Sequence, residues 1–224
     1  MSKHLQRDLD RLQQDILTMA ASVEEAIQKA VRALKERRAD MAAEVIDGDD
    51  MIDAEENQVE EECLKMLALH QPVAVDLRRI IAALKINTDL ERMADLAEDI
   101  AERAVHLARL PEIPVPEKLQ RMTDLTTSMV RQSLDAFVQL DTRLARVVCR
   151  LDDEVDNYNS AIIEELIGVM RRSPEMVEAA LSLFSATRHL ERIADHATNI
   201  AEDVVYLAEG EIVRHRPGAV GIED

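Results

Sequence analysis

The amino-acid sequence predicts an all-α protein made of two tandem three-helix bundles that are related by an internal repeat. Aromatic residues make up only 2% of the 224 residues, and residues that favour long helices dominate. One segment occurs twice, as DLERMADLAEDIAERAVHLA at 89–108 and as HLERIADHATNIAEDVVYLA at 189–208. A proline-rich stretch, PEIPVPEK, separates the copies. We therefore predict bundles over residues 1–109 and 117–210, related by a pseudo-two-fold axis and joined by a linker at 110–116.

Three long helices are expected in the first half. Apolar residues recur at three- and four-residue intervals from Leu5 onwards, which predicts a helix over 3–38. Asp40 has the side chain of an N-cap and is predicted to begin a second helix that ends near His70. Gly48 should weaken that helix without ending it, since one glycine costs about 1 kcal/mol. Pro72 stands where a third helix begins, and this helix carries the first copy of the repeat.

The second half repeats this plan after the linker, whose three prolines exclude a helix. A fourth helix is predicted over 117–140, and a fifth is capped by Asp141. The Ser-Pro pair at 173–174 opens a sixth helix, which closes near Gly210. The tail at 211–224 shows no periodicity and is expected to be mobile. Each half has about 110 residues, so one bundle alone would be marginal and the two are expected to pack together.

Composition excludes several classes of function. The formal net charge of −18 argues against a nucleic-acid partner, because affinity for phosphates comes mainly from clustered Lys and Arg. The same charge suits the binding of cations or of a basic protein surface. Cys63 and Cys149 are isolated, so neither a zinc knuckle nor a disulfide framework is indicated. No apolar run approaches the ~18 residues of a membrane span. We expect a cytoplasmic protein that reaches a membrane only through its partners.

The repeated segments place acidic residues on one face of their helices. Like charges four residues apart cost a few tenths of a kcal/mol in a lone helix, so something is expected to neutralise them. Aspartate pairs also repeat on the preceding helices. The acidic pairs lie at similar distances before and after the turn that joins their helices, and a common rise of ~1.5 Å per residue then brings them to one level. The level residues are Asp49, Asp53, Glu91 and Asp95 in the first half, and Asp152, Asp156, Glu191 and Asp195 in the second.

Four level carboxylates predict a metal site in each half. They are hard oxygen donors, which suit magnesium, manganese, calcium or iron, while affinity order also admits zinc or nickel. Carboxylates four apart can share two ions, so each site is expected to be multinuclear. Asp99 is placed with the first site, and Asn199 stands at the matching position of the second, which is expected to hold its metal more weakly or with fewer ions. The alternative is a solvated acidic face in which arginines at 92 and 192 pair with the aspartates.

Other chemistry is less well supported. His189 and His196 lie on the opposite shoulder of the sixth helix from the acidic pair, so they are expected to contact another helix or the other bundle. A ferritin-like di-iron enzyme needs Glu-x-x-His on two helices, and no histidine follows a glutamate at that spacing. A helical scaffold without metal is a further alternative. The sequence offers no catalytic triad, no GxxxxGK[ST] and no glycine-rich phosphate loop, so we predict no catalytic turnover.

The doubled ERxAD segments and the aspartates before them resemble the PhoU family of phosphate-transport regulators. LALHQPVAVDLR at 67–78 and NIAEDVVYLAEG at 199–210 extend this resemblance over nearly the whole chain. The more usual core in that family reads ERIGD, and here Ala94 and Ala194 replace the glycine.

This resemblance implies a non-enzymatic negative regulator of the phosphate-starvation response and of phosphate uptake. Such proteins act in the cytoplasm between a phosphate ABC transporter, through its ATP-binding subunit, and a sensor histidine kinase. Some members bind metal through E/DxxxD motifs. We also expect a homodimer.

Overall fold

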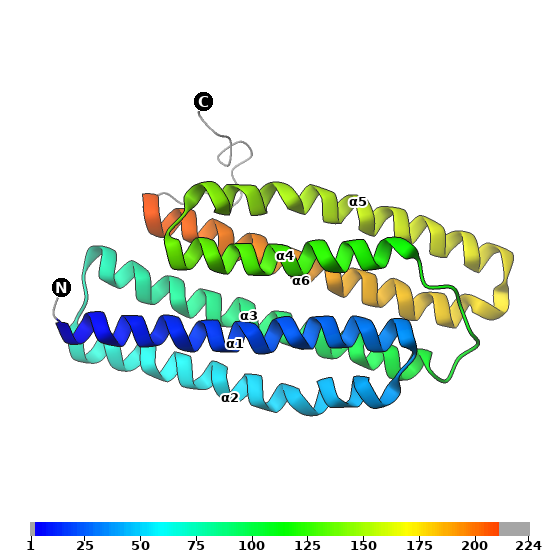
Figure 1. Cartoon of the computed structure of the whole chain (residues 1–224), viewed down its shortest axis with the longest axis horizontal. Helices are drawn as coiled ribbons and strands as arrows, with labels where there is room; N and C mark the ends of the chain where they lie inside the picture. Colours follow the sequence, from blue (N-terminus) through cyan, green and yellow to red (C-terminus); the bar gives the residue numbers. More distant parts are fainter. Residues whose placement is uncertain (1–2, 211–224) are drawn as a thin grey trace.

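The computed structural model describes residues 3–210, which form six long α-helices (Figure 1). In chain order these are α1 (Lys3–Glu36), α2 (Ala39–His70), α3 (Ala74–Leu107), α4 (Glu117–Gln139), α5 (Thr142–Arg172) and α6 (Val177–Glu209), with a short 3₁₀ helix, η1 (Pro174–Met176), before α6. Helices account for 91% of residues 3–210, and these residues contain no strand. The predicted all-α fold is confirmed. The predicted mobile tail at 211–224 lies outside the described residues.

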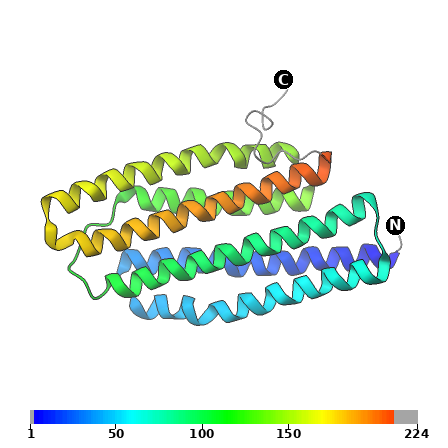
Figure 2. The same cartoon turned by 180° about the vertical axis from the view of Figure 1, so that it is seen from behind.

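The helices form two three-helix bundles, α1–α3 and α4–α6, which meet mainly through α3 and α6. These two helices run antiparallel at the centre of the molecule (Figure 2). Lys85, in the first half of α3, lies 2.9 Å from Asp203 near the end of α6. His106, at the other end of α3, lies 3.0 Å from Ser182 near the start of α6. The contact between α1 and α4 on the other side is much smaller.

Buried alanines are frequent on the central helices α3 and α6. Ala94 and Ala97 of α3, and Ala194 and Ala197 of α6, have at most 2% of their surface exposed. The outer helices contribute larger apolar side chains to the same core. On α1, for example, Ile16, Met19 and Ile27 are fully buried. Burying one such side chain contributes ~1.5–3 kcal/mol, so the apolar stripes supply most of the folding free energy. The acidic residues between α2 and α3, and between α5 and α6, flank this core.

Several predicted helix ends are confirmed. The Asp141 side chain accepts hydrogen bonds from the backbone N–H groups of Arg143 and Leu144, at 2.9 and 3.0 Å, and so caps α5. Gly210 follows α6 with a φ of 77°, the left-handed conformation that glycine adopts without strain. Gly48 lies inside α2, which continues through it.

Two predicted helix starts are wrong. Arg37 takes a φ of 56° at the end of α1, and the N–H of Arg38 returns to the carbonyl of Ala33 at 2.9 Å. This tight turn makes extended Arg38 the N-cap of α2, so Asp40 lies in the first turn and pairs with Arg38 instead of capping. At the next turn, α3 begins at Ala74 after extended Val73, and Pro72 lies before the helix. No helix of residues 3–210 is long and apolar enough to cross a membrane.

Candidate functional site

Carboxylates from α2 and α3 meet along one line between these helices. We call this line the first acidic seam and define it as Asp49, Asp53 and Glu56 of α2 with Glu91, Asp95 and Glu98 of α3. Burial raises the pKa of Asp49, and the charges of Asp53 on its own helix and Asp95 across the gap raise it further. Burial also raises the pKa of Glu91, with further contributions from Asp95, Glu56 and Asp53. The two helices therefore hold their carboxylates at one level.

The same arrangement occurs between α5 and α6. The second acidic seam consists of Asp152, Asp156 and Asn159 of α5 with Glu191, Asp195 and Thr198 of α6. Burial, followed by the charges of Asp195 and Asp156, raises the pKa of Asp152 to about 6, although the Thr198 side chain acts in the opposite direction. Burial and Asp156 also raise the pKa of Asp195. Burial, followed by the charges of Asp195 and Asp156, raises the pKa of Glu191 as well, so these two aspartates act on each of the other predicted ligands of this half.

Arginines neutralise the seams only in part. Arg92 lies 3.1 Å from Asp95 and 3.4 Å from Glu91, so the pairing expected of a solvated face is present in the first seam. In the second seam Arg188, rather than Arg192, pairs with Glu191 at 2.9 Å. The other oxygen of Glu191 is buried and has no hydrogen-bond partner in residues 3–210.

The aspartates that α2 and α5 contribute to the seams differ from the acidic residues of α3 and α6 in their charged partners. No Lys, Arg or His of the described range forms an ion pair with Asp49, Asp53, Asp152 or Asp156. Asp53 and Asp156 are exposed to solvent, whereas Asp49 and Asp152 are half-buried.

Asp99 and Asn199 lie away from the seams, between α3 and α6. Asp99 Oδ2 is 3.5 Å from Nδ1 of His189. Asn199 Nδ2 donates to Asp89 Oδ1 at 3.4 Å, and Nδ1 of His196 lies 2.8 Å from the same oxygen. The expectation that both histidines contact the other bundle is confirmed. Asp99 and Asn199, which the sequence placed with the first and second metal sites, therefore take part in the contact between the two bundles.

The donor set fits a hard divalent cation, but the shell is not preformed. Within residues 3–210, no three His, Cys, Asp or Glu side chains already converge so that they could hold one ion. Adjacent helix axes lie ~8–10 Å apart, a gap that Asp and Glu side chains from both helices can span after rotation about their own bonds. A bound cation would replace the mutual repulsion of the carboxylates with attraction and would connect the two helices of a seam.

Sequence analysis did not count two members of the first seam, Glu56 and Glu98, among the predicted ligands. Glu56 follows Asp53 by three residues, and Glu98 follows Asp95 by three, which places each on the face of its neighbour. Extending the acidic stripe by one helical turn would have found both. Burial raises the pKa of Glu98, and the charge of Asp49 across the gap raises it further. In the second seam Asn159 and Thr198 occupy the corresponding places.

Known proteins share both the sequence and the fold. The family model described as PhoU domain matches residues 16–104 and 119–204, one range in each bundle. The chain is 43% identical over 210 residues to the "Phosphate-specific transport system accessory protein PhoU homolog" of Aquifex aeolicus, which covers 94% of this chain and 95% of that protein. The corresponding protein of Deinococcus radiodurans is 38% identical, with 94% and 99% covered.

Two crystal structures have closely similar folds. PhoU from Pseudomonas aeruginosa superposes with a TM-score of 0.87 at 36% identity, over 92% of this chain and 99% of that chain. The phosphate transport system regulatory protein PhoU from Streptococcus pneumoniae also gives 0.87, at 32% identity over 93% and 99%. With both bundles matched by the family model and the whole fold shared with solved members, this chain belongs to the PhoU family.

Proposed function

We propose that this protein is a regulatory accessory protein of a phosphate-specific transport system. In this role it restrains phosphate uptake and the phosphate-starvation response when phosphate is plentiful. The observation that carries the proposal is the 43% identity, over 94% of the chain, with a relative named as an accessory protein of such a system. Its relatives' names describe an accessory component and no reaction, which supports action by binding without catalytic turnover.

We further propose two partners, both at the cytoplasmic side of a membrane. One is the ATP-binding subunit of a phosphate ABC transporter, and the other is a sensor histidine kinase. Contact with both would let one protein report the state of the transporter to the kinase. The extensive contact between α3 and α6 supports this adaptor role, because it joins the two bundles into one molecule that can present two surfaces at once.

The partner proposal is tested by affinity capture with the tagged full-length chain. Cytoplasm and solubilised membranes are taken from cells grown with ample phosphate and from starved cells, and captured proteins are identified by mass spectrometry. We expect the transporter subunit and the kinase in the phosphate-replete sample. An unrelated acidic helical protein carrying the same tag controls for charge. Recovery of neither partner over a range of salt concentrations would refute the adaptor role.

We propose that the two acidic seams hold divalent cations, with iron, manganese, magnesium, zinc and nickel as candidates. The support is the pair of carboxylate lines whose charges the described residues do not balance. Elemental analysis of protein purified without chelator or metal-affinity steps identifies the metal. If the protein takes up no metal after loading with Fe²⁺, Mn²⁺ or Zn²⁺, the seams are a solvated acidic face and the protein is a metal-free scaffold.

A further inference from the structure

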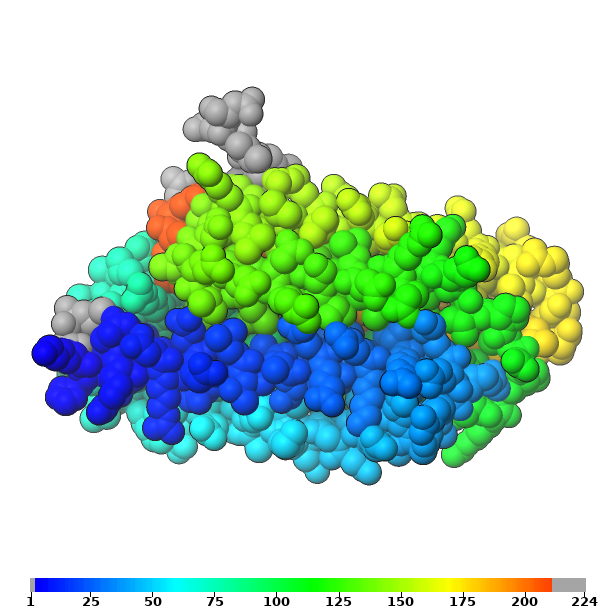
Figure 3. Space-filling view, viewed as in Figure 1, coloured from blue at the N-terminus to red at the C-terminus, as the bar shows by residue number. Residues whose placement is uncertain are grey.

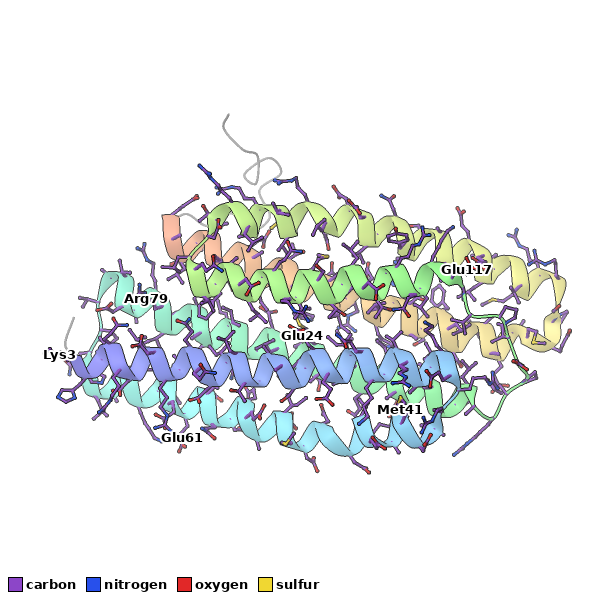
Figure 4. All side chains as sticks on the ribbon, in the orientation of Figure 1. Lys3, Glu24, Met41, Glu61, Arg79 and Glu117 are labelled. Atoms are coloured by element: carbon purple, nitrogen blue, oxygen red, sulfur yellow. The ribbon has the colours of Figure 1, made fainter. Side chains whose placement is uncertain are left out.

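A cleft separates α1 from α4 on the face opposite the α3–α6 pair. Figure 3 shows these two helices meeting along a shallow line on this face. The cleft has a volume of about 680 Å³ and is lined by the last quarter of α1, from Gln28 to Glu36, and by α4 from Gln120 to Arg131. Polar bridges close it at both ends. Lys35 donates to the side-chain oxygen of Gln120 at one end, and Arg131 binds Glu24 at 2.6 Å at the other. Figure 4 labels Glu24 on α1.

The charge of this cleft differs from that of the rest of the protein. Its lining has three basic side chains, Arg32, Lys35 and Arg131, and two acidic ones, Glu36 and Asp124. Two further carboxylates, Glu24 and Asp135, act on Arg131 from the edge of the cleft, in a chain whose net charge is −18. Lys35 has a neutral amide as its partner and forms no ion pair with a carboxylate of the described chain. Within the lining itself the basic side chains therefore outnumber the acidic ones by one, unlike in the chain as a whole.

Both arginines can offer N–H groups to a ligand. Arg32 pairs with Glu36 at 2.9 Å, with 64% and 43% of the two side chains exposed. Arg131 is 62% exposed in its pair with Glu24, whose own side chain is only 17% exposed. The exposed Arg32–Glu36 pair contributes about 0–1 kcal/mol, so a ligand that offers better geometry can replace Glu36. Arg131 binds Glu24 through one nitrogen and can offer its other N–H groups to a ligand without releasing Glu24. A phosphate group offers suitable geometry, because its oxygens match the parallel N–H groups of a guanidinium.

The floor of the cleft adds a buried hydroxyl without a partner. Thr127 lines the cleft and is 7% exposed, and its hydroxyl has no hydrogen-bond partner among residues 3–210. Neighbouring Thr123 differs, because its hydroxyl donates to the Leu119 carbonyl at 2.7 Å. A threonine in a helix divides its population between two rotamers, and rotation of Thr127 exchanges its methyl and hydroxyl groups. Leaving a buried hydroxyl unpaired costs ~1–3 kcal/mol, and a polar ligand on this floor relieves that cost.

We propose that the α1–α4 cleft binds a phosphorylated small molecule of about nucleotide size. The phosphates contact Arg32, Lys35 and Arg131, and a polar group of the ligand bonds to Thr127. Volumes of ~300–1,000 Å³ are typical of small-molecule sites, and inorganic phosphate alone would fill only a small part of this one. The ligand would bind α1 of one bundle and α4 of the other, where the bundles touch least. The proposal depends neither on the acidic seams nor on the regulatory role.

ATP is the probe, with inorganic phosphate and adenosine as comparisons. Isothermal titration of the full-length chain is done with a chelator present, so that no cation in the acidic seams can bridge to the phosphates. We expect ATP to bind at micromolar to millimolar concentration, phosphate more weakly and adenosine not at all. Arg32→Gln and Arg131→Gln are each expected to weaken ATP binding by about tenfold. Arg32→Lys should recover part of the loss, because it keeps the charge but not the paired N–H groups.

Thr127→Val separates binding from folding. It removes a hydroxyl that has no partner, so the thermal midpoint should stay unchanged or rise while ATP binding weakens. Arg171→Gln, at the far end of α5, is the matched charge control and should leave the affinity unchanged. Absence of ATP binding at millimolar concentration, or equal affinities in the wild type and both arginine variants, would overturn the proposal. Binding of adenosine or phosphate as tightly as ATP would overturn the assignment of a phosphorylated ligand of this size.

Discussion

The first acidic seam, on α2 and α3, and the second, on α5 and α6, occupy corresponding places in the internal repeat. They differ in the number of carboxylates and in how deeply these are buried. The first has six carboxylates, whereas the second has four, with Asn159 and Thr198 in the places of Glu56 and Glu98. The second is more enclosed, since 13% of the Glu191 side chain is exposed compared with 23% of Glu91. One backbone repeat therefore supports two electrostatic environments. Four common carboxylates fix the position of each seam, and the next helical turn sets its charge.

This difference has consequences for ion binding. Affinity and capacity for hard cations rise with the number of charged ligands, which favours the first seam. Burial raises the free energy of charged carboxylates that lack a cation, and this effect is greatest at Asp152, whose pKa it raises to about 6. The first seam is therefore expected to hold more ions. The second is expected to respond more strongly to protons when no ion is bound.

The largest expected effect is the loss of one shared ligand. We expect Asp95→Asn and Asp195→Asn each to weaken metal binding in its own seam by about a hundredfold, equivalent to ~2.8 kcal/mol. The helices should remain formed, because apolar burial supplies most of the folding free energy. Metal content, thermal midpoint and circular dichroism are measured with and without chelator. Glu164→Gln, an exposed change on α5, is the control. Full metal occupancy in both aspartate variants would show that the seams do not hold the metal.

The two seams differ at the position of Glu98 and Thr198. Exchanging these residues tests whether the number of carboxylates determines the cation affinity of each seam. Thr198→Glu gives the second seam a fifth carboxylate, and Glu98→Thr removes one from the first. We expect affinity to rise in the former and fall in the latter by about tenfold, equivalent to ~1.4 kcal/mol. Titration with Mn²⁺, followed by electron paramagnetic resonance, measures both. If the two exchanges change affinity in the same direction, depth rather than charge controls binding.

The level of the carboxylates could be predicted from sequence because it depends on one nearly constant quantity. Helix rise varies little, so counting from the turn placed Asp49 opposite Asp95 and Asp152 opposite Asp195, as their pKa shifts reflect. The repeat also identified the two bundles and the central pair of helices that carries it. Prediction was best where local geometry alone determined the result.

The remaining errors concern features that depend on packing. Asp99 lies only one turn beyond Asp95, but it faces His189 of the other bundle, a neighbour that one sequence does not specify. The turn at Arg37 places a residue other than glycine at positive φ, where Arg37 also donates to the carbonyls of Leu110 and Pro111 in the linker. These contacts between distant segments determined the start of α2. Asp40 has a side chain that is preferred at N-caps, but Arg38 is the N-cap of α2.

The seams should also differ in their response to pH when metal is absent. The pKa of Asp152 is raised to about 6, so between this value and its usual one the folded protein binds a proton more readily than the unfolded chain. Its contribution to stability is complete below pH ~4 and is lost as the pH rises through 6. His189, whose pKa burial lowers, acts in the opposite direction, because its neutral form is favoured in the folded protein.

The contribution of Asp152 is isolated by comparison with Asp152→Asn. With chelator present, the free energy of unfolding of the wild type relative to this variant should fall between pH 5 and pH 7, by on the order of 1 kcal/mol after solvent screening is considered. Urea unfolding at both values measures it. Asp49→Asn in the first seam should show a smaller change in the same direction, because burial and neighbouring charges raise the pKa of Asp49 less. A larger change in the first seam would contradict the difference in depth.

The smallest effect concerns Asn199, which breaks the repeat at the position of Asp99. Its side chain donates to Asp89 at 3.4 Å, and His196 lies 2.8 Å from the same oxygen. Asn199→Asp replaces this donor with a second carboxylate, and the repulsion should lower the free energy of unfolding by a few tenths of a kcal/mol at neutral pH. Asn199→Ala removes the hydrogen bond without adding charge and should cost less. Because residue 199 faces Asp89 and not Asp195, the metal content should stay the same in both variants. A gain of metal in Asn199→Asp, with no loss of stability, would instead assign this position to the second seam.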